Sequence, residues 1–431
     1  MSAVLSPSSA PSRSARRARA AVAALFLTNG ALFANVVPRY PQIKAELGVS
    51  NAVLGTALAA MPLGALLAGL FAAAIIRRFR SGPVAAVGIV VLAVSTLALP
   101  FAPTWVVFAV LIGLVGALDA IVDVAQNSHG LRVQRVYGRS IVNSFHGLWS
   151  IGAVTGGLMG SAAAGLRLPL ALHLTISALL FSAVALAALR YLLPGPDTAE
   201  RPSTEPTPDA APSAEGASSG HPASDTVGGG PAAGAASVAG GSGRRRVAGH
   251  AVRMIAALGL LAACGALVED AGASWGALYL TGLGAGAATA GLAFVALQTA
   301  MTIGRLTGDR VVDRFGQRTV ARAGGALAAL GMGLALALPS VPTTLAGFAL
   351  AGLGFATLVP AAMLTADELP GLAPGTGLTV VSWLLRGGFL LSPPLVGLLA
   401  DATSLRVGLL TVVAAGLITV IGARVLLNRT P

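Results

Sequence analysis

Long apolar stretches alternate with short polar segments along almost the whole chain. Twelve stretches, each about 20 residues or longer, can be delimited: 20–38, 51–76, 83–101, 104–131, 140–165, 169–193, 251–281, 286–308, 318–339, 342–366, 375–400 and 406–427. A helix of ~20 apolar residues is long enough to cross the ~30 Å hydrocarbon core of a bilayer. The pattern therefore predicts an all-α integral membrane protein with twelve transmembrane helices.

The predicted spans form two groups of six, separated by a polar stretch rich in proline, glycine, serine and alanine. Such a stretch buries too little apolar surface to fold by itself. We therefore expect four parts: a basic cytoplasmic tail over 1–19, an amino-terminal six-helix bundle over 20–193, a disordered cytoplasmic linker over 194–250, and a carboxy-terminal six-helix bundle over 251–427. Two related helix bundles are typical of secondary transporters.

Composition and charge support a membrane protein and predict its orientation. Hydrophobic residues make up 55% of the chain and charged residues 10%, whereas a soluble domain carries ~25% charged residues. The net charge is +12, and most lysines and arginines fall in the amino-terminal tail, in every second loop and at the carboxy-terminal end. Only four lie on the opposite side: Arg39, Lys44, Arg167 and Arg406. The positive-inside rule then predicts that both termini and the linker are cytoplasmic, so the basic charge reflects topology and indicates no nucleic acid as a partner.

The loop after the eighth span carries a short charged motif. Its core, Asp313-Arg314-x-Gly316-x-Arg318, resembles the cytoplasmic loop signature of the major facilitator superfamily. An aspartate at a helix end beside several arginines favours charge-assisted bonds between neighbouring helix ends. These four residues are therefore candidates for a cytoplasmic gate.

The matching position in the amino-terminal half departs from the signature. After the second span the chain reads Arg77-Arg78-Phe79-Arg80. Arg77 stands where the signature has aspartate, and Arg80 stands where it has glycine. The amino-terminal copy of the gate is therefore degenerate.

Within that superfamily the chain resembles bacterial inner-membrane transporters of the rhizopine and sugar permease type. The resemblance is carried by Arg39-Tyr40-Pro41, Asp123-Val124-Ala125-Gln126-Asn127, Ser144-Phe145-His146-Gly147 and Trp275. It implies two six-helix bundles and a place in the bacterial cytoplasmic membrane. The arginine of span four and the prolines of span five that many proton-coupled drug exporters carry are absent, which weakens the case for drug efflux.

Ionisable residues inside the predicted spans are few, and they are the candidates for coupling. A charged side chain at the centre of a bilayer costs ~2.5–3.5 kcal/mol, so it is expected to face a cavity or a partner. Asp119, Asp123 and Asn127 are spaced four residues apart and lie on one stripe of span four. Asp119 falls near the middle of the membrane, where we expect it to line the cavity and carry protons. Asp123 is also a candidate for proton coupling and Asn127 for the substrate cavity, but an intracellular gate or a packing hydrogen bond agrees with the sequence at least as well for both.

Span seven and span eleven carry charges near their centres. Adjacent helical residues point ~100° apart, so we expect one of Glu269 and Asp270 to face the cavity, with Glu269 favoured. Arg386 in span eleven requires a carboxylate partner or an anionic substrate, and the two acids of span seven are the expected partners. Trp275 is a candidate for stacking on a substrate or for anchoring at the external interface.

Three further polar residues interrupt apolar spans. His146 in span five is a candidate for proton exchange, because histidine titrates near neutral pH; a hydrogen-bonded core residue is the alternative. Asn29 in span one and Gln298 in span eight are candidates for binding a polar solute or for joining helices.

Glycines in span five indicate close helix packing. Gly152, Gly156 and Gly160 recur every four residues, so they form one flat ridge that a neighbouring backbone can approach. We expect this ridge to serve helix packing first.

The sequence contains no pattern typical of an enzyme. It has no P-loop and no cysteine or histidine cluster with metal-ligand spacing, so we expect no catalytic residue, cofactor or metal site. The leading hypothesis is a monomeric secondary transporter that moves a small polar organic solute by alternating access, coupled to protons through Asp119 and Glu269 or Asp270. Two alternatives are an exporter of drug-like, amphipathic compounds and a membrane receptor or scaffold that acts through the linker.

Overall fold

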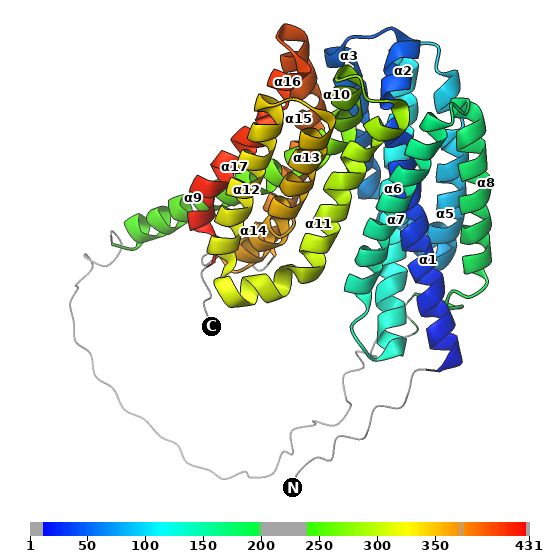
Figure 1. Ribbon diagram of the computed structural model, residues 1–431. Coiled ribbons are helices and arrows are strands. Elements are labelled where there is room, and N and C mark those ends of the chain that lie inside the picture. Colours follow the sequence, from blue (N-terminus) through cyan, green and yellow to red (C-terminus); the bar gives the residue numbers. More distant parts are fainter. Residues whose placement is uncertain (1–11, 198, 200–238, 370–371, 374, 428–431) are drawn as a thin grey trace, which may run out of the picture.

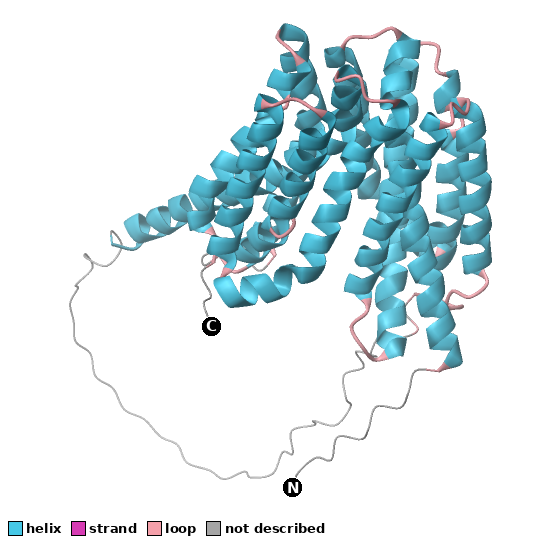
Figure 2. Ribbon diagram, in the orientation of Figure 1, coloured by secondary structure: helices cyan, strands magenta, loops and turns pink. Residues whose placement is uncertain are grey.

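A computed structural model describes residues 12–197, 199, 239–369, 372–373 and 375–427, without the side chains of 239–250. Within these residues the chain consists of helices and short connecting loops (Figure 2). The predicted all-α fold is confirmed.

The amino-terminal bundle contains the first six spans. Its elements are α1 (Arg13–Val36), a 3₁₀ turn (Val37–Arg39), α2 (Tyr40–Leu47), α3 (Asn51–Leu58), α4 (Ala60–Phe79), α5 (Ser81–Thr96), a 3₁₀ turn (Leu99–Phe101), α6 (Trp105–Tyr137), α7 (Val142–Gly165) and α8 (Leu170–Leu189). α3 and α4 together form the second span.

The carboxy-terminal bundle contains the last six spans. Its elements are α9 (Ala239–Asp270), a π-helical turn (Ala271–Trp275), α10 (Gly276–Gly282), α11 (Ala287–Phe315), α12 (Gln317–Ala337), α13 (Val341–Phe355), α14 (Leu358–Asp367), α15 (Thr376–Ala402), α16 (Leu405–Gly408), α17 (Leu410–Gly422) and a 3₁₀ turn (Ala423–Val425). α9 and α10 form the seventh span, and α13 and α14 form the tenth.

Eleven helical runs in the described residues are long and apolar enough to cross a membrane. They coincide with eleven of the predicted stretches. The remaining stretch forms α7, which is rich in glycine and serine and packs along α1. All twelve predicted spans are therefore helical, and they form two bundles that lie side by side (Figure 1).

Local sequence signals set where several helices begin and end. The hydroxyl oxygens of Ser12, Ser50 and Thr104 accept bonds from backbone N–H groups in the first turns of α1, α3 and α6, at 3.1, 3.4 and 3.4 Å. These bonds satisfy donors that have no partner inside the helix. At the carboxyl ends, Gly48 after α2 and Gly138 after α6 adopt left-handed backbone conformations, with φ of 63° and 71°.

The glycine ridge of α7 packs directly on the backbone of α1. A Cβ atom added to any of the three ridge glycines, Gly152, Gly156 and Gly160, would overlap a carbonyl oxygen of α1. The two helices therefore approach as closely as glycine allows, which confirms the predicted packing surface.

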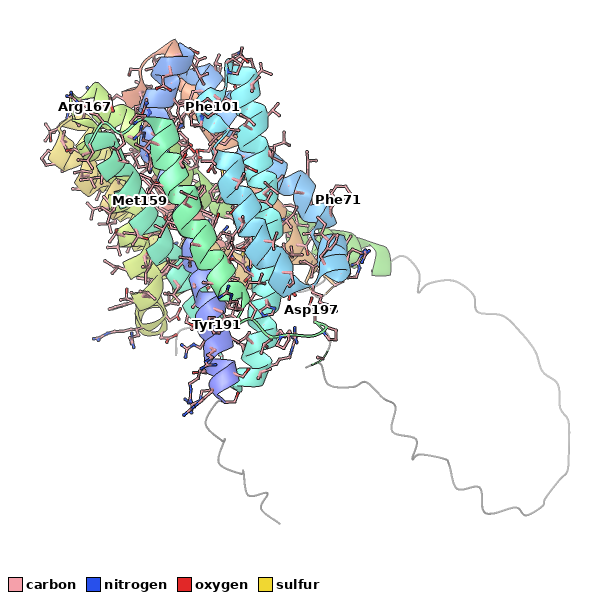
Figure 3. The ribbon with its side chains drawn as sticks, turned by 90° about the vertical axis from the view of Figure 1, so that its right-hand side faces the viewer. Phe71, Phe101, Met159, Arg167, Tyr191 and Asp197 are labelled. Atoms are coloured by element: carbon pink, nitrogen blue, oxygen red, sulfur yellow. The ribbon has the colours of Figure 1, made fainter. Side chains whose placement is uncertain are left out.

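The two ends of the molecule differ in which helix ends and loops they hold. The termini end is the end where α1 begins and α17 ends, and the loop end is the opposite one, where α2, α10 and α16 lie (Figure 1). Figure 3 shows Phe101 and Arg167 at the loop end and Tyr191 and Asp197 at the termini end.

Close contacts between the bundles occur toward the loop end. α3 packs against α15, and α7 packs against α11. Where α3 meets α15, Gly55 faces the carbonyl of Pro393, and Gly397 faces the carbonyl of Asn51. Neither glycine has room for a Cβ, so this interface depends on both.

The boundaries of the predicted linker differ from the structure. α9 begins at Ala239, so 239–250 is helical and does not belong to a disordered segment. These residues contain no proline and lead directly into the apolar span, which lets the helix extend toward its amino end. Residues 200–238 lie outside the described residues, and the linker there stays a prediction.

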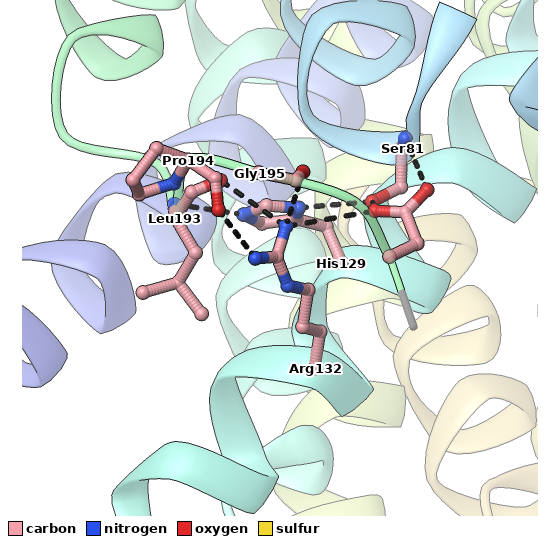
Figure 4. Close-up of polar contacts among 7 residues, drawn as sticks. Ser81, His129, Arg132, Leu193, Pro194 and Gly195 are labelled. Carbon is pink, nitrogen blue, oxygen red and sulfur yellow. Dashed lines mark hydrogen bonds and ion pairs between the residues drawn. The ribbon is translucent and has the colours of Figure 1, made fainter. Parts of the chain in front are cut away.

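The first residues of the predicted linker are bound to the amino-terminal bundle (Figure 4). The Arg132 guanidinium donates to the carbonyl oxygens of 193–195 and lies 3.7 Å from the carboxylate of Asp197. Asp197 accepts bonds from the backbone N–H and the hydroxyl of Ser81, at 2.8 and 2.6 Å. His129 lies 2.9 Å from the Ser81 hydroxyl through Nδ1. We call Ser81, His129, Arg132 and Asp197 the linker clasp.

Candidate functional site

A cavity of about 250 Å³ lies between the two bundles. Three carboxylates line it: Asp119 from α6, and Glu269 and Asp270 from the last turn of α9. Ligand pockets in proteins span ~300–1,000 Å³, so this volume suits a small solute. The predicted coupling residues of the two bundles therefore meet at one place.

Asp119 belongs to a short chain of hydrogen bonds inside the amino-terminal bundle. The Asn29 amide Nδ2 donates to Asp119 Oδ1 at 2.7 Å, and the Trp149 indole Nε1 donates to Asn29 Oδ1 at 2.8 Å. The three side chains come from α6, α1 and α7, so this chain joins three spans. Asn29 is oriented by the indole, and its amide is the group that holds the carboxylate of Asp119.

The two acids of span seven have different partners. Glu269 Oε2 lies 3.2 Å from Nη2 of Arg305 on α11. Asp270 Oδ1 accepts a bond from the Ser274 hydroxyl at 2.8 Å. The other oxygen, Asp270 Oδ2, is buried and has no hydrogen-bond partner among the described residues.

Both Glu269 and Asp270 line the cavity, although adjacent helical residues were expected to separate. The two side chains diverge by ~100° on a helix, and a cavity that extends around the last turn of α9 receives both. The π-helical turn that follows, Ala271–Trp275, places Ser274 against the same cavity.

Aromatic rings form the apolar part of the cavity wall. Phe33 stacks on Trp149 with ring centroids 6.1 Å apart, and it meets Phe294 edge to face at 6.4 Å. The second contact crosses from α1 to α11, so an aromatic surface joins the two bundles beside the acids. Tyr40 and Phe389 complete the aromatic lining.

Arg386 lies near Asp123 of the other bundle, and within the described part of the chain it forms no ion pair with span seven. The charges of Arg386 and His146 both act on Asp123, and all three residues are exposed. Asn127 Nδ2 donates to Asp123 Oδ1 at 3.0 Å. The expected pairing of Arg386 with Glu269 or Asp270 differs from the structure, because Arg305, one helix away, already compensates Glu269.

Comparison with known proteins assigns the family. The profile of the Major Facilitator Superfamily matches residues 22–219 and 259–431. The chain belongs to this superfamily. It is therefore a multi-pass membrane transporter and not an enzyme.

Relatives of this superfamily member span nearly its whole length. The uncharacterized transporter y4wD of Sinorhizobium fredii is 30% identical over 386 residues, which are 89% of this chain and 92% of that protein. Membrane protein MosC of Rhizobium meliloti is 30% identical over 410 residues, 92% of this chain and 87% of that protein. Among solved structures, a bacterial homologue of the human lysosomal transporter Spinster, in an inward-facing and unoccupied conformation, has a TM-score of 0.71 at 16% identity. The match covers 97% of this chain and 99% of the homologue, and this similarity shows the fold.

Two predicted cavity residues of the transporter lie inside the carboxy-terminal bundle instead. Trp275 is 0% exposed at the end of the π-helical turn, and its indole Nε1 is buried without a partner among the described residues. Gln298 is 1% exposed on α11. Neither lines the central cavity, and the predicted roles of Trp275 and Gln298 toward a solute stay predictions.

The superfamily signature forms the turn between α11 and α12. Gly316 adopts φ 77° and ψ 151° at this turn. Arg318 Nε donates to the carbonyl of Leu426 at 2.6 Å, which joins the start of α12 to the chain end after α17. Asp313 and Arg314 are exposed and have no ion pair among the described residues. Their part in a cytoplasmic gate stays a prediction.

A carboxylate bridges the bundles at the loop end. Asp401 Oδ1 accepts bonds from the Asn51 backbone N–H and side-chain amide, both at 2.9 Å, and Asp401 Oδ2 accepts from the Ala52 N–H at 2.7 Å. An acid from α15 thus caps the amino end of α3, where the helix dipole favours negative charge. We call Asp401, Asn51 and Ala52 the loop-end latch.

Sequence reasoning missed Arg305, Trp149 and Asp401. Trp149 lies three residues after His146, so it lies near the same helix face, which was a usable signal. Arg305 lies within the predicted span 286–308, but Arg386 was expected as the cation beside the acids of span seven. Asp401 has a partner 350 residues away along the chain, and no local pattern predicts that contact.

Proposed function

We propose that this transporter moves a small polar organic solute by alternating access and that it is coupled to protons. The observation that carries the proposal is Asp119, whose carboxylate lines the cavity and is bonded to an amide instead of a cation. An uncompensated carboxylate is costly in a membrane interior, and binding a proton removes that cost. Asp119 is therefore suited to exchange a proton as the cavity changes the side to which it opens.

The cavity walls support a small solute that carries hydrogen-bond donors. Asp119 and the unpartnered oxygen of Asp270 offer acceptors from opposite bundles. Phe33, Trp149 and Phe294 offer flat apolar faces beside them. A compact solute with hydroxyl or amine groups matches both features. The cavity, the Asp401 contact with Asn51 and Ala52, and the predicted cytoplasmic gate lie within one chain, which supports a monomer as the working unit.

The orientation follows from the distribution of basic residues. Loops at the termini end hold most arginines of the chain, which supports a cytoplasmic position for that end. The loop-end latch and the α3–α15 and α7–α11 contacts close the opposite end. In this orientation the structure corresponds to a state that is closed to the outside.

Export of amphipathic compounds is the second candidate, and the aromatic wall of the cavity favours it. An exporter of this kind is expected to depend little on buried charge. The volume of about 250 Å³ and the three carboxylates argue for the polar solute. Neutralisation of Asp119 separates the two candidates.

The first experiment identifies a solute. Purified protein is screened by thermal shift against sugars, polyols, amino acids and antibiotics. A ligand at ~100 times its dissociation constant stabilises a folded protein by ~2.7 kcal/mol when it does not bind the unfolded state. Stabilisation by polar solutes alone supports the proposal, and stabilisation by antibiotics alone supports the second candidate.

The second experiment tests the coupling. Asp119→Asn keeps the shape of the side chain and removes its titration. In proteoliposomes with an imposed pH gradient, we expect this variant to exchange the identified solute down its gradient but not to accumulate or expel it against one. Asp309→Asn, at an exposed position of α11 outside the cavity, is the matched control and is expected to behave as wild type. Uphill transport by Asp119→Asn at the wild-type rate would rule out Asp119 as the proton site.

A further inference from the structure

A second cavity, at the loop end, is not used by the proposed transport mechanism. It has a volume of about 430 Å³ and walls from both bundles. Arg39, Gln42 and Arg167 line it on the amino-terminal side, and Thr281 lines it on the carboxy-terminal side. Figure 3 shows Arg167 at this end of the molecule. The cavity therefore combines two arginines with neutral hydrogen-bonding side chains.

Arg39 is a buried cation with an incomplete set of partners. Its side chain is 1% exposed, and Nη2 donates to the carbonyl of Leu168 at 2.7 Å. Nε and Nη1 are buried without a partner among the described residues. The charge of Glu46 acts on Arg39, but the Glu46 carboxylate is exposed and accepts its bond from Gln42 Nε2, at 2.7 Å. A buried charge without a bonded counter-charge is costly, so we expect an additional anion to bind Arg39.

Arg167 brings a second positive charge to the same cavity. It is exposed, and it has no hydrogen bond or ion pair through its side chain among the described residues. Its φ of 55° lies in the left-handed region, which costs free energy for a residue with a side chain. Arg39 and Arg167 are also two of the four basic residues that lie against the positive-inside bias, so topology explains neither.

We propose that this cavity binds a small oxyanion, a carboxylate or phosphate group, between Arg39 and Arg167. Guanidinium groups bind these anions through charge-assisted hydrogen bonds. The Gln42 side-chain amide donates one of its two N–H groups to Glu46, and the other N–H adds a neutral donor to the cavity. The cavity in this form requires the loop end to be closed, so a bound anion stabilises the closed state relative to the open one. This last step rests on the proposed alternating access, whereas the binding itself does not.

The binding is tested with inorganic phosphate on the purified full-length protein. Thermal shift is measured against phosphate concentration at constant ionic strength, with chloride as the balancing anion. We expect phosphate to stabilise the wild type and Arg167→Gln to weaken its apparent affinity about tenfold, because one charge-assisted bond is lost. Lys44→Gln removes a charge at the same end but outside the cavity, and it is expected to leave the affinity within about twofold.

Arg167 is the position of choice because its side chain is exposed and its removal spares the fold, whereas a variant of buried Arg39 risks misfolding. Absence of any phosphate-dependent shift in the wild type overturns the proposal. Equal weakening by Arg167→Gln and Lys44→Gln also overturns it, because the effect would then come from general surface charge.

The source of the anion is resolved in nanodiscs. Phosphate affinity is compared in phosphatidylglycerol and phosphatidylcholine discs for the wild type and Arg167→Gln. If phosphatidylglycerol lowers the phosphate affinity of the wild type but not that of Arg167→Gln, the occupant is a lipid headgroup. If the affinity is the same in both kinds of disc, the occupant is a free anion. Either result is consistent with an anion site in this cavity.

The effect on conformation is measured by cysteine labelling. In a Cys264→Ser background, Asp123→Cys reports access from the termini end. Phosphate is expected to speed its labelling, and Arg167→Gln is expected to abolish that acceleration. Unchanged labelling with phosphate bound would overturn the conformational step and leave the proposed function untouched.

Discussion

The two bundles repeat one plan of six spans, yet they hold their central acids differently. In the amino-terminal bundle, Asp119 is bonded to the Asn29 amide at 2.7 Å. In the carboxy-terminal bundle, Glu269 pairs with the Arg305 guanidinium at 3.2 Å. Glu269 thus has a cationic partner, whereas the hydrogen-bond partner of Asp119 is a neutral amide. Both acids line one cavity, and under the proposed function we expect Asp119 to be the coupling acid and Glu269 to be structural.

The turn after the second span of each bundle shows a different contrast. Arg80 adopts φ 68° and ψ 151°, and Gly316 at the corresponding turn adopts φ 77° and ψ 151°. Only glycine adopts this region without strain. The amino-terminal turn therefore keeps the geometry of the superfamily signature with a residue that is poorly suited to it.

The largest expected effect is a difference in uphill transport between variants of Asp119 and variants of Glu269. Asp119→Asn should reduce uphill transport to the level of empty liposomes. The double variant Glu269→Gln/Arg305→Gln removes the ion pair without leaving an unpaired charge, and it should retain uphill transport. Proton-driven uptake or efflux of the identified solute measures both, and a reversed outcome would exchange the roles of the two bundles.

Arg132 and Arg318 provide the next comparison, since each binds carbonyl groups after the last span of its bundle. Arg132 is 2% exposed and contacts three carbonyls and Asp197, whereas Arg318 binds one carbonyl. We expect Arg132→Gln to lower the free energy of unfolding by ~2–3 kcal/mol and Arg318→Gln by ~1 kcal/mol. Denaturant unfolding in mixed micelles measures both free energies of unfolding. Equal losses in the two variants would show that the additional contacts of Arg132 add no stability beyond that of a single carbonyl bond.

The two signature turns should respond in opposite directions. Arg80→Gly relieves backbone strain and is expected to stabilise the protein by ~1 kcal/mol, while Gly316→Ala introduces strain and is expected to cost ~1–2 kcal/mol. Unfolding midpoints of both variants test this. A loss of stability in Arg80→Gly would mean that the arginine side chain contributes more than its backbone costs.

The smallest expected effect is the coupling free energy between Glu269 and Arg305. Arg305 is 38% exposed, so solvent screens its bond to Glu269, and a double-mutant cycle should give a coupling of ~0.5 kcal/mol. Arg386→Leu combined with Glu269→Gln should give additive losses. Coupling between Arg386 and Glu269 instead would restore the pairing that the sequence suggested.

The fold was predictable because its signal is repeated along the chain. Each span carries its own run of apolar residues, and the ridge of Gly152, Gly156 and Gly160 predicted a close helix contact that the structure contains. Asp119 was predictable as a cavity residue because an acid near the middle of a span requires either a cavity or a partner.

The partners of the site residues were not predictable in the same way. Small residues occur on every face of these helices, so the rotation of each span about its axis is not set by its pattern. Trp275 was therefore expected at a cavity or interface and is fully buried, and Arg386 was expected beside span seven and lies near Asp123. Such contacts depend on how two bundles meet, which no local stretch of sequence encodes.

The latch between Asp401 and α3 implies an asymmetry in the timing of the transport cycle. Opening the loop end withdraws a charged acceptor from three donors on Asn51 and Ala52, while Ser50 still caps the same helix. Each such exchange with water adds to the barrier of that one step. In the proposed orientation the loop end faces the outside. We then expect the transporter without solute to stay closed at that end, so that reopening to the outside limits the turnover rate more than solute release to the cytoplasm.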